Sequence, residues 1–137
     1  MTEIAIMTTA RRQLLDVTGR IEDALRTLGA ENGLCHCWVP HTTAALVVNE
    51  NADPDVGRDL LACYEALVPP LRFAHGEGNS DAHFLATVLG CSLILPVSSG
   101  RLRLGAWQGV FFVELDGPRA RRLQVTLAAL GERGLHG

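Results

Sequence analysis

The hydrophobic positions of this 137-residue chain follow two periods, one typical of helices and one typical of strands. We expect three helices, over residues 18–28, 53–68 and 80–89. Each range begins with residues that favour a helix start and ends before glycine or proline. The first helix is bounded by Asp16 and Thr18 at its start and Gly29 at its end, the second by Asp53 and Pro54 at its start and Pro69 and Pro70 at its end, and the third by Ser80 and Gly90.

Between these helices, short apolar runs predict strands at residues 4–7, 33–41, 44–50, 91–97, 102–104, 109–115 and 119–127. Alternation within 33–41 places Leu34, His36 and Trp38 on one face and Cys35, Cys37, Val39 and His41 on the other. Residues 44–50 and 110–115 are apolar on both faces, so helices or another subunit must supply a second cover. The pattern predicts one α+β domain over residues 1–137, with a loose tail at 131–137.

Composition narrows the function classes. All 12 basic residues are arginine, which excludes a Schiff-base or P-loop lysine on this chain. The net charge of −3 disfavours nucleic-acid binding. No apolar run reaches the roughly 18 residues that cross a membrane, and the N-terminus lacks a secretory signal, so we expect a soluble, cytoplasmic protein. The four cysteines are expected to be reduced and mostly buried.

Three histidines stand at predicted element edges: His41 ends a strand, His75 begins a glycine-rich loop, and His83 lies in the first turn of a helix. Three imidazoles that leave one position open are the ligand set of a catalytic zinc site. The positive end of the helix would keep His83 neutral, as a metal ligand must be. Oxygen ligands from Glu77, Asp81 or Glu50 would favour a harder cation such as magnesium. The alternative is that each histidine is structural.

The loop formed by Gly76, Glu77, Gly78 and Asn79 precedes a helix start, where glycines and free backbone N–H groups suit a phosphate. Glu77 would repel that phosphate unless a metal bridges them. A tight turn into the helix explains the same residues equally well.

Arg119 and Arg121 share the apolar face of the strand predicted at 119–127, which aims both toward the rim of the interior. Either internal pairing with Glu114 or Asp116 or a phosphorylated ligand would satisfy them. Trp107 and Gln108 could supply an aromatic wall and an amide for a flat heterocycle, with core packing of Trp107 as the alternative.

From His41 onward the chain resembles the YjbQ-like family, described as secondary thiamine-phosphate synthase enzymes. The resemblance spans about residues 33–125 and rests on motifs in the expected order: His41-Thr-Thr-Ala-Ala-Leu46, Asn49-Glu50, Asp53-Pro-Asp-Val56 with Asp59, His75-Gly-Glu-Gly-Asn-Ser-Asp-Ala-His83, Gly105-Ala-Trp-Gln108 and Glu114-Leu-Asp-Gly-Pro-Arg119. Ala106 and Cys91 replace the expected Thr and Ser, and neither touches the expected chemistry.

The resemblance implies a homotrimer with mostly antiparallel sheets, about three helices and a divalent metal, zinc favoured, at His41, His75 and His83. It also implies a secondary activity that joins a thiazole phosphate to a pyrimidine diphosphate, giving thiamine phosphate and diphosphate. In such a metal-dependent transferase, the catalytic residues are expected to be Glu77, Arg119 and Gln108, and the ligand-binding residues Gly76, Gly78, Asn79 and Trp107. A non-catalytic metal- or metabolite-binding trimer and a metal-dependent hydrolase of another phosphorylated metabolite are the alternatives.

Overall fold

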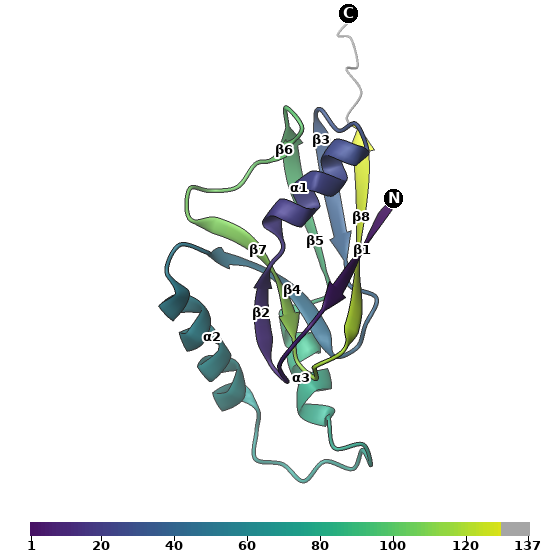
Figure 1. Cartoon of the computed structure of the whole chain (residues 1–137). Coiled ribbons are helices and arrows are strands. Elements are labelled where there is room, and N and C mark those ends of the chain that lie inside the picture. Colours follow the sequence, from purple (N-terminus) through teal and green to yellow (C-terminus); the bar gives the residue numbers. More distant parts are fainter. Residues whose placement is uncertain (130–137) are drawn as a thin grey trace, which may run out of the picture.

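Two antiparallel sheets form the framework of the computed structural model, which describes residues 1–129 (Figure 1). One sheet has the strand order β1-β8-β3-β5-β6 and the other has the order β2-β7-β4. The elements are β1 (Thr2–Met7), β2 (Gln13–Asp16), α1 (Thr18–Thr27), β3 (Gly33–Trp38), β4 (Ala44–Glu50), α2 (Pro54–Leu67), α3 (Ser80–Leu89), β5 (Ser92–Ser98), β6 (Arg101–Leu102), β7 (Gln108–Glu114) and β8 (Ala120–Ala129). The chain is therefore a single-domain α+β fold, as predicted, and the expected tail at 131–137 lies outside the described residues.

The main core fills the space enclosed by the two sheets and α1. The buried faces of β3 and β8 contribute Cys35, Cys37, Leu123 and Val125, which pack in one cluster with residues of the other sheet and of α1: Ala44, Leu46, Val110, Phe112, Ile21 and Leu25. On β3 the predicted alternation is confirmed, because Leu34, His36 and Trp38 are exposed while Cys35 and Cys37 are buried.

A second core lies on the other face of the three-stranded sheet, against α2 and α3. Ala45, Val113 and Leu115 pack there with Leu85 and Tyr64. Helices therefore supply the second cover that the doubly apolar strands required. Among the residues of α2 only Tyr64 is buried, so this helix stands partly away from the sheet (Figure 1).

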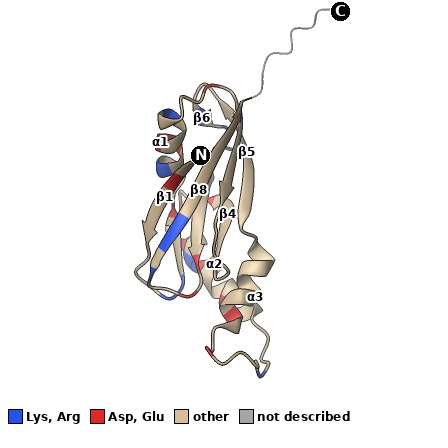
Figure 2. Cartoon of the chain, turned by 90° about the vertical axis from the view of Figure 1, so that its right-hand side faces the viewer, with Lys and Arg blue, Asp and Glu red and all other residues tan. Residues whose placement is uncertain are grey.

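The outer face of the five-stranded sheet carries no helix within residues 1–129. β1 and β8 lie side by side on it (Figure 2), and Arg122 of β8 pairs with Glu3 of β1 at 3.6 Å. Leu34, Trp38 and Ile94 are exposed large hydrophobic residues of this sheet. In the same part of the chain, no helix is long and apolar enough to span a membrane.

The predicted helix starts have different outcomes. Asp53 caps α2 as expected, because its Oδ1 accepts a hydrogen bond from the Asp55 backbone at 2.9 Å. The prediction that Ser80 caps α3 was wrong: Ser80 is the first helical residue, and Asn79 occupies the cap position. Asn79 makes no side-chain cap bond, and its amide donates to Asp116 Oδ2 at 2.9 Å instead.

Three other expectations need correction. β2 was not predicted, because it is short and follows polar residues. The strand expected at 33–41 ends at Trp38, since Val39 donates to the carbonyl of Cys91 and Pro40 has no N–H to continue the ladder. All four cysteines are free thiols as expected, but Cys63 and Cys91 are exposed rather than buried.

Candidate functional site

His41 and His83 both line a cavity of about 330 Å³ at one end of the three-stranded sheet. His41 lies in the connection from β3 to β4, and His83 lies in the first turn of α3. Glu77, Asn79, Arg119 and Arg121 line the same cavity, and the two histidines also line an adjacent hollow of about 340 Å³. Segments 42 residues apart in sequence are thus brought together, as the metal hypothesis requires for two of its three ligands.

The third predicted ligand, His75, lies next to His83. Their ring centroids are 5.7 Å apart and the rings meet edge to face. His75 Nε2 is 3.9 Å from Glu77 Oε2. His75 therefore lies beside His83 but is not among the residues that line either hollow, and no three His, Cys, Asp or Glu side chains in residues 1–129 are placed as a metal-ligand group.

A hydrogen bond at His41 explains in part why these histidines are not arranged as metal ligands. Its Nε2 accepts a hydrogen bond from the backbone N–H of Arg122 at 2.9 Å, so the lone pair of the neutral ring is already engaged. Burial lowers the pKa of His41, and the positive charges of Arg121 and Arg122 lower it further. The ring is held neutral, which suits a metal ligand, but Nε2 must leave the Arg122 backbone before it can coordinate.

The glycine-rich loop forms a turn in which the backbone N–H of Gly78 donates to the carbonyl of His75 at 3.3 Å. Gly78 has a φ of +74°, a conformation that glycine adopts without strain. Asn79 Oδ1 is buried and has no hydrogen-bond partner in the described part of the chain. An unpaired buried carbonyl oxygen beside two imidazoles and the carboxylate of Glu77 is compatible in kind with a bound cation.

Arg121 is the buried cation of this site, with only 4% of its surface exposed. Its Nε donates to Glu114 Oε1 at 3.0 Å, and its Nη2 donates to Glu114 Oε2 at 2.6 Å and to Thr43 Oγ1 at 2.8 Å. Thr8 Oγ1 donates to Glu114 Oε1 at 2.7 Å. Of the two readings left open for Arg121, internal pairing is the one observed, and the residue still lines the cavity.

Glu114 is fully buried. Burial by itself would raise the pKa of its carboxyl group, but the hydrogen bonds from Arg121 and Thr8 outweigh burial and hold the pKa below its ordinary value. The pair therefore stays ionised, and each buried charge has its partner.

Arg119 differs from the prediction that it shares the inward face with Arg121. It precedes the first residue of β8, and its side chain is 51% exposed. Its Nη2 donates to Asp116 Oδ2 at 3.1 Å, so the turn before the strand, rather than the strand, sets its direction. Arg119 lines the cavity as the more exposed of the two arginines.

Trp107 and Gln108 are not brought to this cavity within one chain. Gln108 pairs with Glu50 at one end of the β4–β7 ladder, whereas Glu114 pairs with Ala44 at the other end. Six residue steps separate these ends by roughly 20 Å. Trp107 is 66% exposed, so the alternative of core packing is also wrong, and Gln108 Oε1 accepts from the Gly105 backbone in the preceding loop.

The prediction overlooked two residues that hold the site together, Thr8 and Thr43. Thr43 stands two residues after His41, so its proximity could have been inferred from the motif. Thr8 is 106 residues from Glu114, and no local signal connects them.

Comparisons with known proteins agree with one another. A family model described as UPF0047 protein YjbQ-like matches residues 2–130. The chain is 42% identical over 123 residues to UPF0047 protein MJ1081 of Methanocaldococcus jannaschii, covering 89% of each. It is 40% identical over 126 residues to UPF0047 protein YugU of Bacillus subtilis, covering 90% of this chain and 96% of that one. A crystal structure of an uncharacterised YjbQ/UPF0047 protein from Clostridium acetobutylicum has a TM-score of 0.89 at 39% identity, and the match covers 93% of this chain and 100% of that one.

Proposed function

The chain belongs to the UPF0047 YjbQ-like family, as its motifs predicted, and we propose its function from its own side chains. The names of these relatives state no activity. We propose that it is an enzyme that acts on a small phosphorylated compound with the help of a divalent cation. The cavity shared by His41, His83, Glu77, Arg119 and Arg121 is the observation that carries this proposal. Guanidinium groups bind phosphate, and imidazole with carboxylate suits a divalent cation.

The proposed metal ligands are His41, His75 and His83, with Glu77 and Asn79 Oδ1 as additional oxygen donors. Zinc is favoured by the imidazoles, and the two oxygens would also admit magnesium or another cation. When bound, the cation would offset negative charge that develops on phosphate oxygens. Arg119 would contribute to the same end, since its exposed guanidinium can turn toward a ligand while Arg121 is held by Glu114.

Thiamine-phosphate synthesis is the named reaction that we propose to test, as a secondary activity. In that reaction the bond between the pyrimidine methylene and diphosphate breaks, the thiazole nitrogen forms a new bond to the methylene, and diphosphate departs. The cavity residues would orient the phosphates and offset their charge. Gln108 and Trp107 could take part only from a neighbouring copy, which agrees with the homotrimer that the resemblance implies and that we also propose. We propose that the protein acts in the cytoplasm.

His83→Ala tests the proposal, with His36→Ala as its control because His36 is exposed on β3, outside the cavity. Tag-free protein is measured for bound metal by elemental analysis and for the coupling of the two phosphorylated precursors. We expect His83→Ala to lose both metal and turnover while His36→Ala keeps both. Full turnover in metal-free His83→Ala protein would refute the proposal.

Two further outcomes separate the alternatives. Wild-type protein that retains metal and binds the precursors without converting them would be a non-catalytic binding protein. Release of phosphate or diphosphate from one precursor alone, without a coupled product, would indicate a metal-dependent hydrolase.

A further inference from the structure

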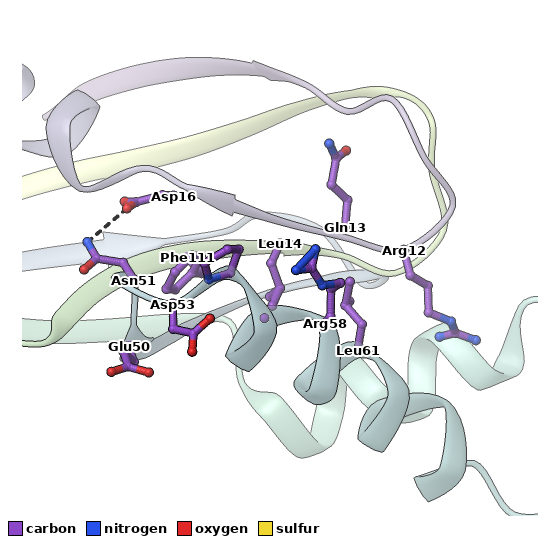
Figure 3. Close-up of a pocket in the computed structure, with 12 residues that line it drawn as sticks. Arg12, Gln13, Leu14, Asp16, Glu50, Asn51, Asp53, Arg58, Leu61 and Phe111 are labelled. Atoms are coloured by element: carbon purple, nitrogen blue, oxygen red, sulfur yellow. Dashed lines mark hydrogen bonds between the residues drawn. The ribbon is translucent and has the colours of Figure 1, made fainter.

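A second cavity, of about 410 Å³, lies between α2 and the edge of the three-stranded sheet (Figure 3). Its apolar lining comes from Leu14 of β2, Phe111 of β7, and Pro54 and Leu61 of α2. The volume is within the range of about 300–1,000 Å³ that small-molecule sites occupy. None of its lining residues lines the histidine cavity.

One end of this cavity is acidic. Figure 3 shows Asp16, Glu50 and Asp53 at the same end, with Asn51 among them. Asp16 is fixed in place, because Oδ1 accepts from the Thr18 backbone at 3.0 Å and Oδ2 accepts from the Asn51 side chain at 3.1 Å. The carboxylate of Glu50 is half-buried and makes no hydrogen bond or ion pair with the other described side chains. It is therefore available to a ligand.

The two arginines that line the cavity do not balance this acidity. Arg58 Nε donates to Asp55 Oδ1 at 3.0 Å, and Arg12 pairs with Glu65 and Asp81. These partners lie outside the cavity lining, so each guanidinium already has a carboxylate partner, although the buried Nη1 of Arg12 has no hydrogen-bond partner in the described part of the chain. The positive end of α2 is likewise occupied by its cap, Asp53. Three carboxylates against two paired guanidinium groups leave the lining with an excess of negative charge, which favours a cation over an anion.

Gly57 keeps the cavity open. It lies in the second turn of α2, where glycine weakens a helix relative to alanine. A Cβ at this position would lie 3.6 Å from Leu14 Cδ1, which is ordinary contact. Alanine would therefore fit, whereas a longer side chain would extend over the apolar floor. A residue type that weakens the helix thus leaves room for a ligand.

We propose that this cavity binds a small organic cation with an aromatic or other apolar body. The ammonium group would lie between Glu50 and Asp16, and the body would rest on Leu14, Leu61 and Phe111. Apolar lining with a few fixed polar groups is the usual composition of a small-molecule site. Phe111 adds a ring that can attract the cation as well as pack with it.

Benzylamine, which is protonated at pH 7.5, is the probe, and benzyl alcohol and benzoate are its neutral and anionic controls. Binding to the full chain is followed by NMR titration of backbone amides. We expect saturable benzylamine binding at the amides of residues 14–16 and 50–61, at least fivefold tighter than binding of either control. Glu50→Gln should weaken benzylamine binding at least fivefold, whereas Glu31→Gln, on an exposed acid outside the cavity, should leave it unchanged.

Gly57→Leu should abolish benzylamine binding and Gly57→Ala should retain it. A dispersed amide spectrum confirms that the leucine variant is folded, and Glu50→Gln tests the same site if it is not. Equal affinity for the three probes, tighter binding of benzoate, or full binding by Gly57→Leu would overturn the proposal. The proposal would also be overturned if the wild type bound no amine and Gly57→Leu changed the mass of the assembly. A neighbouring copy, rather than a ligand, would then fill the cavity. His83→Ala should leave benzylamine binding unchanged, which separates this site from the proposed catalytic one.

Discussion

The buried pair of Glu114 and Arg121 makes a measurable contribution to folding, and Glu114→Gln isolates it. The neutral amide keeps the shape of the side chain but leaves the Arg121 guanidinium, 4% exposed, without a counter-charge. Removing one partner of a buried ion pair costs about 3–5 kcal/mol. A domain is stable by only about 5–15 kcal/mol, so the variant would lose a large share of its free energy of unfolding.

Thermal and urea unfolding, followed by circular dichroism, measure this loss. For a chain of this length 1 kcal/mol corresponds to roughly 3–4 °C in Tm, so we expect Glu114→Gln to melt roughly 10–18 °C below the wild type. Asp23→Asn is the matched control, since Asp23 pairs with Arg26 at 2.8 Å on the surface and both side chains are at least 70% exposed. An exposed pair contributes little, and the control should melt within about 2 °C of the wild type.

The pair also predicts how stability depends on pH. Because the pKa of Glu114 is lower in the folded chain than its ordinary value of 4.5, the unfolded state binds more protons near that pH. The stability that ionised Glu114 provides is complete above pH 4.5 and is lost as the pH falls through the lower, folded pKa. Glu114→Gln should remove that part of the acid sensitivity.

A double variant, Glu114→Leu with Arg121→Leu, tests whether the loss of stability in Glu114→Gln comes from the unpaired charge of Arg121 rather than from substitution at this position. Apolar replacement of a whole buried pair is often close to neutral, so the double variant should be more stable than Glu114→Gln. If Glu114→Gln melts within 3 °C of the wild type, or if the double variant is the less stable of the two, the pair does not act as reasoned here.

Two further predictions test local structure. Asp53→Ala should lower stability by about 1 kcal/mol because Asp53 caps α2, whereas Ser80→Ala should change it little because the Ser80 side chain caps nothing; equal losses in urea unfolding would contradict this. Gly33→Ala should lower the free energy of unfolding by about 1–3 kcal/mol, since its Cβ would lie 2.3 Å from the Ala128 carbonyl oxygen. Gly19→Ala, whose Cβ would have nothing within 4 Å, should stabilise α1 by up to about 1 kcal/mol. Comparable Tm shifts of the same sign for the two glycines would count against this geometry.

Local signals account for the parts of the fold that were predicted well. The start of α2 was predicted because Asp53 satisfies an N–H only two residues away. β4 was predicted with its observed bounds because its apolar run is continuous. β2 was missed because a four-residue strand is defined by its partner β7, which lies about 100 residues further along the chain.

The positions of the candidate site residues were predicted well where motif and local geometry coincide, and less well where an exact strand boundary or a remote partner decides them. His41 and His83 line one cavity because β4 and α3 pack against each other, and the metal hypothesis required these two residues to be neighbours. Arg119 was misplaced by a single residue, because the strand begins at Ala120 and a turn directs the arginine to solvent. The role of Thr8 follows from the pairing of β1 with β8, which brings it to Glu114, and pattern alone does not reveal that register.

The register of β4 against β7 explains why one predicted site is divided in two. Ala44 pairs with Glu114 and Glu50 pairs with Gln108, so the polar motifs that flank these strands collect at opposite ends of the same ladder. The middle of the ladder, Val110 to Val113, is apolar and separates the two ends. A ligand small enough for either cavity cannot bridge roughly 20 Å within one chain. If both cavities bind ligands as proposed, the histidine end and the Glu50 end must bind separate molecules, unless a second copy brings the Glu50 end of one chain to the histidine end of another.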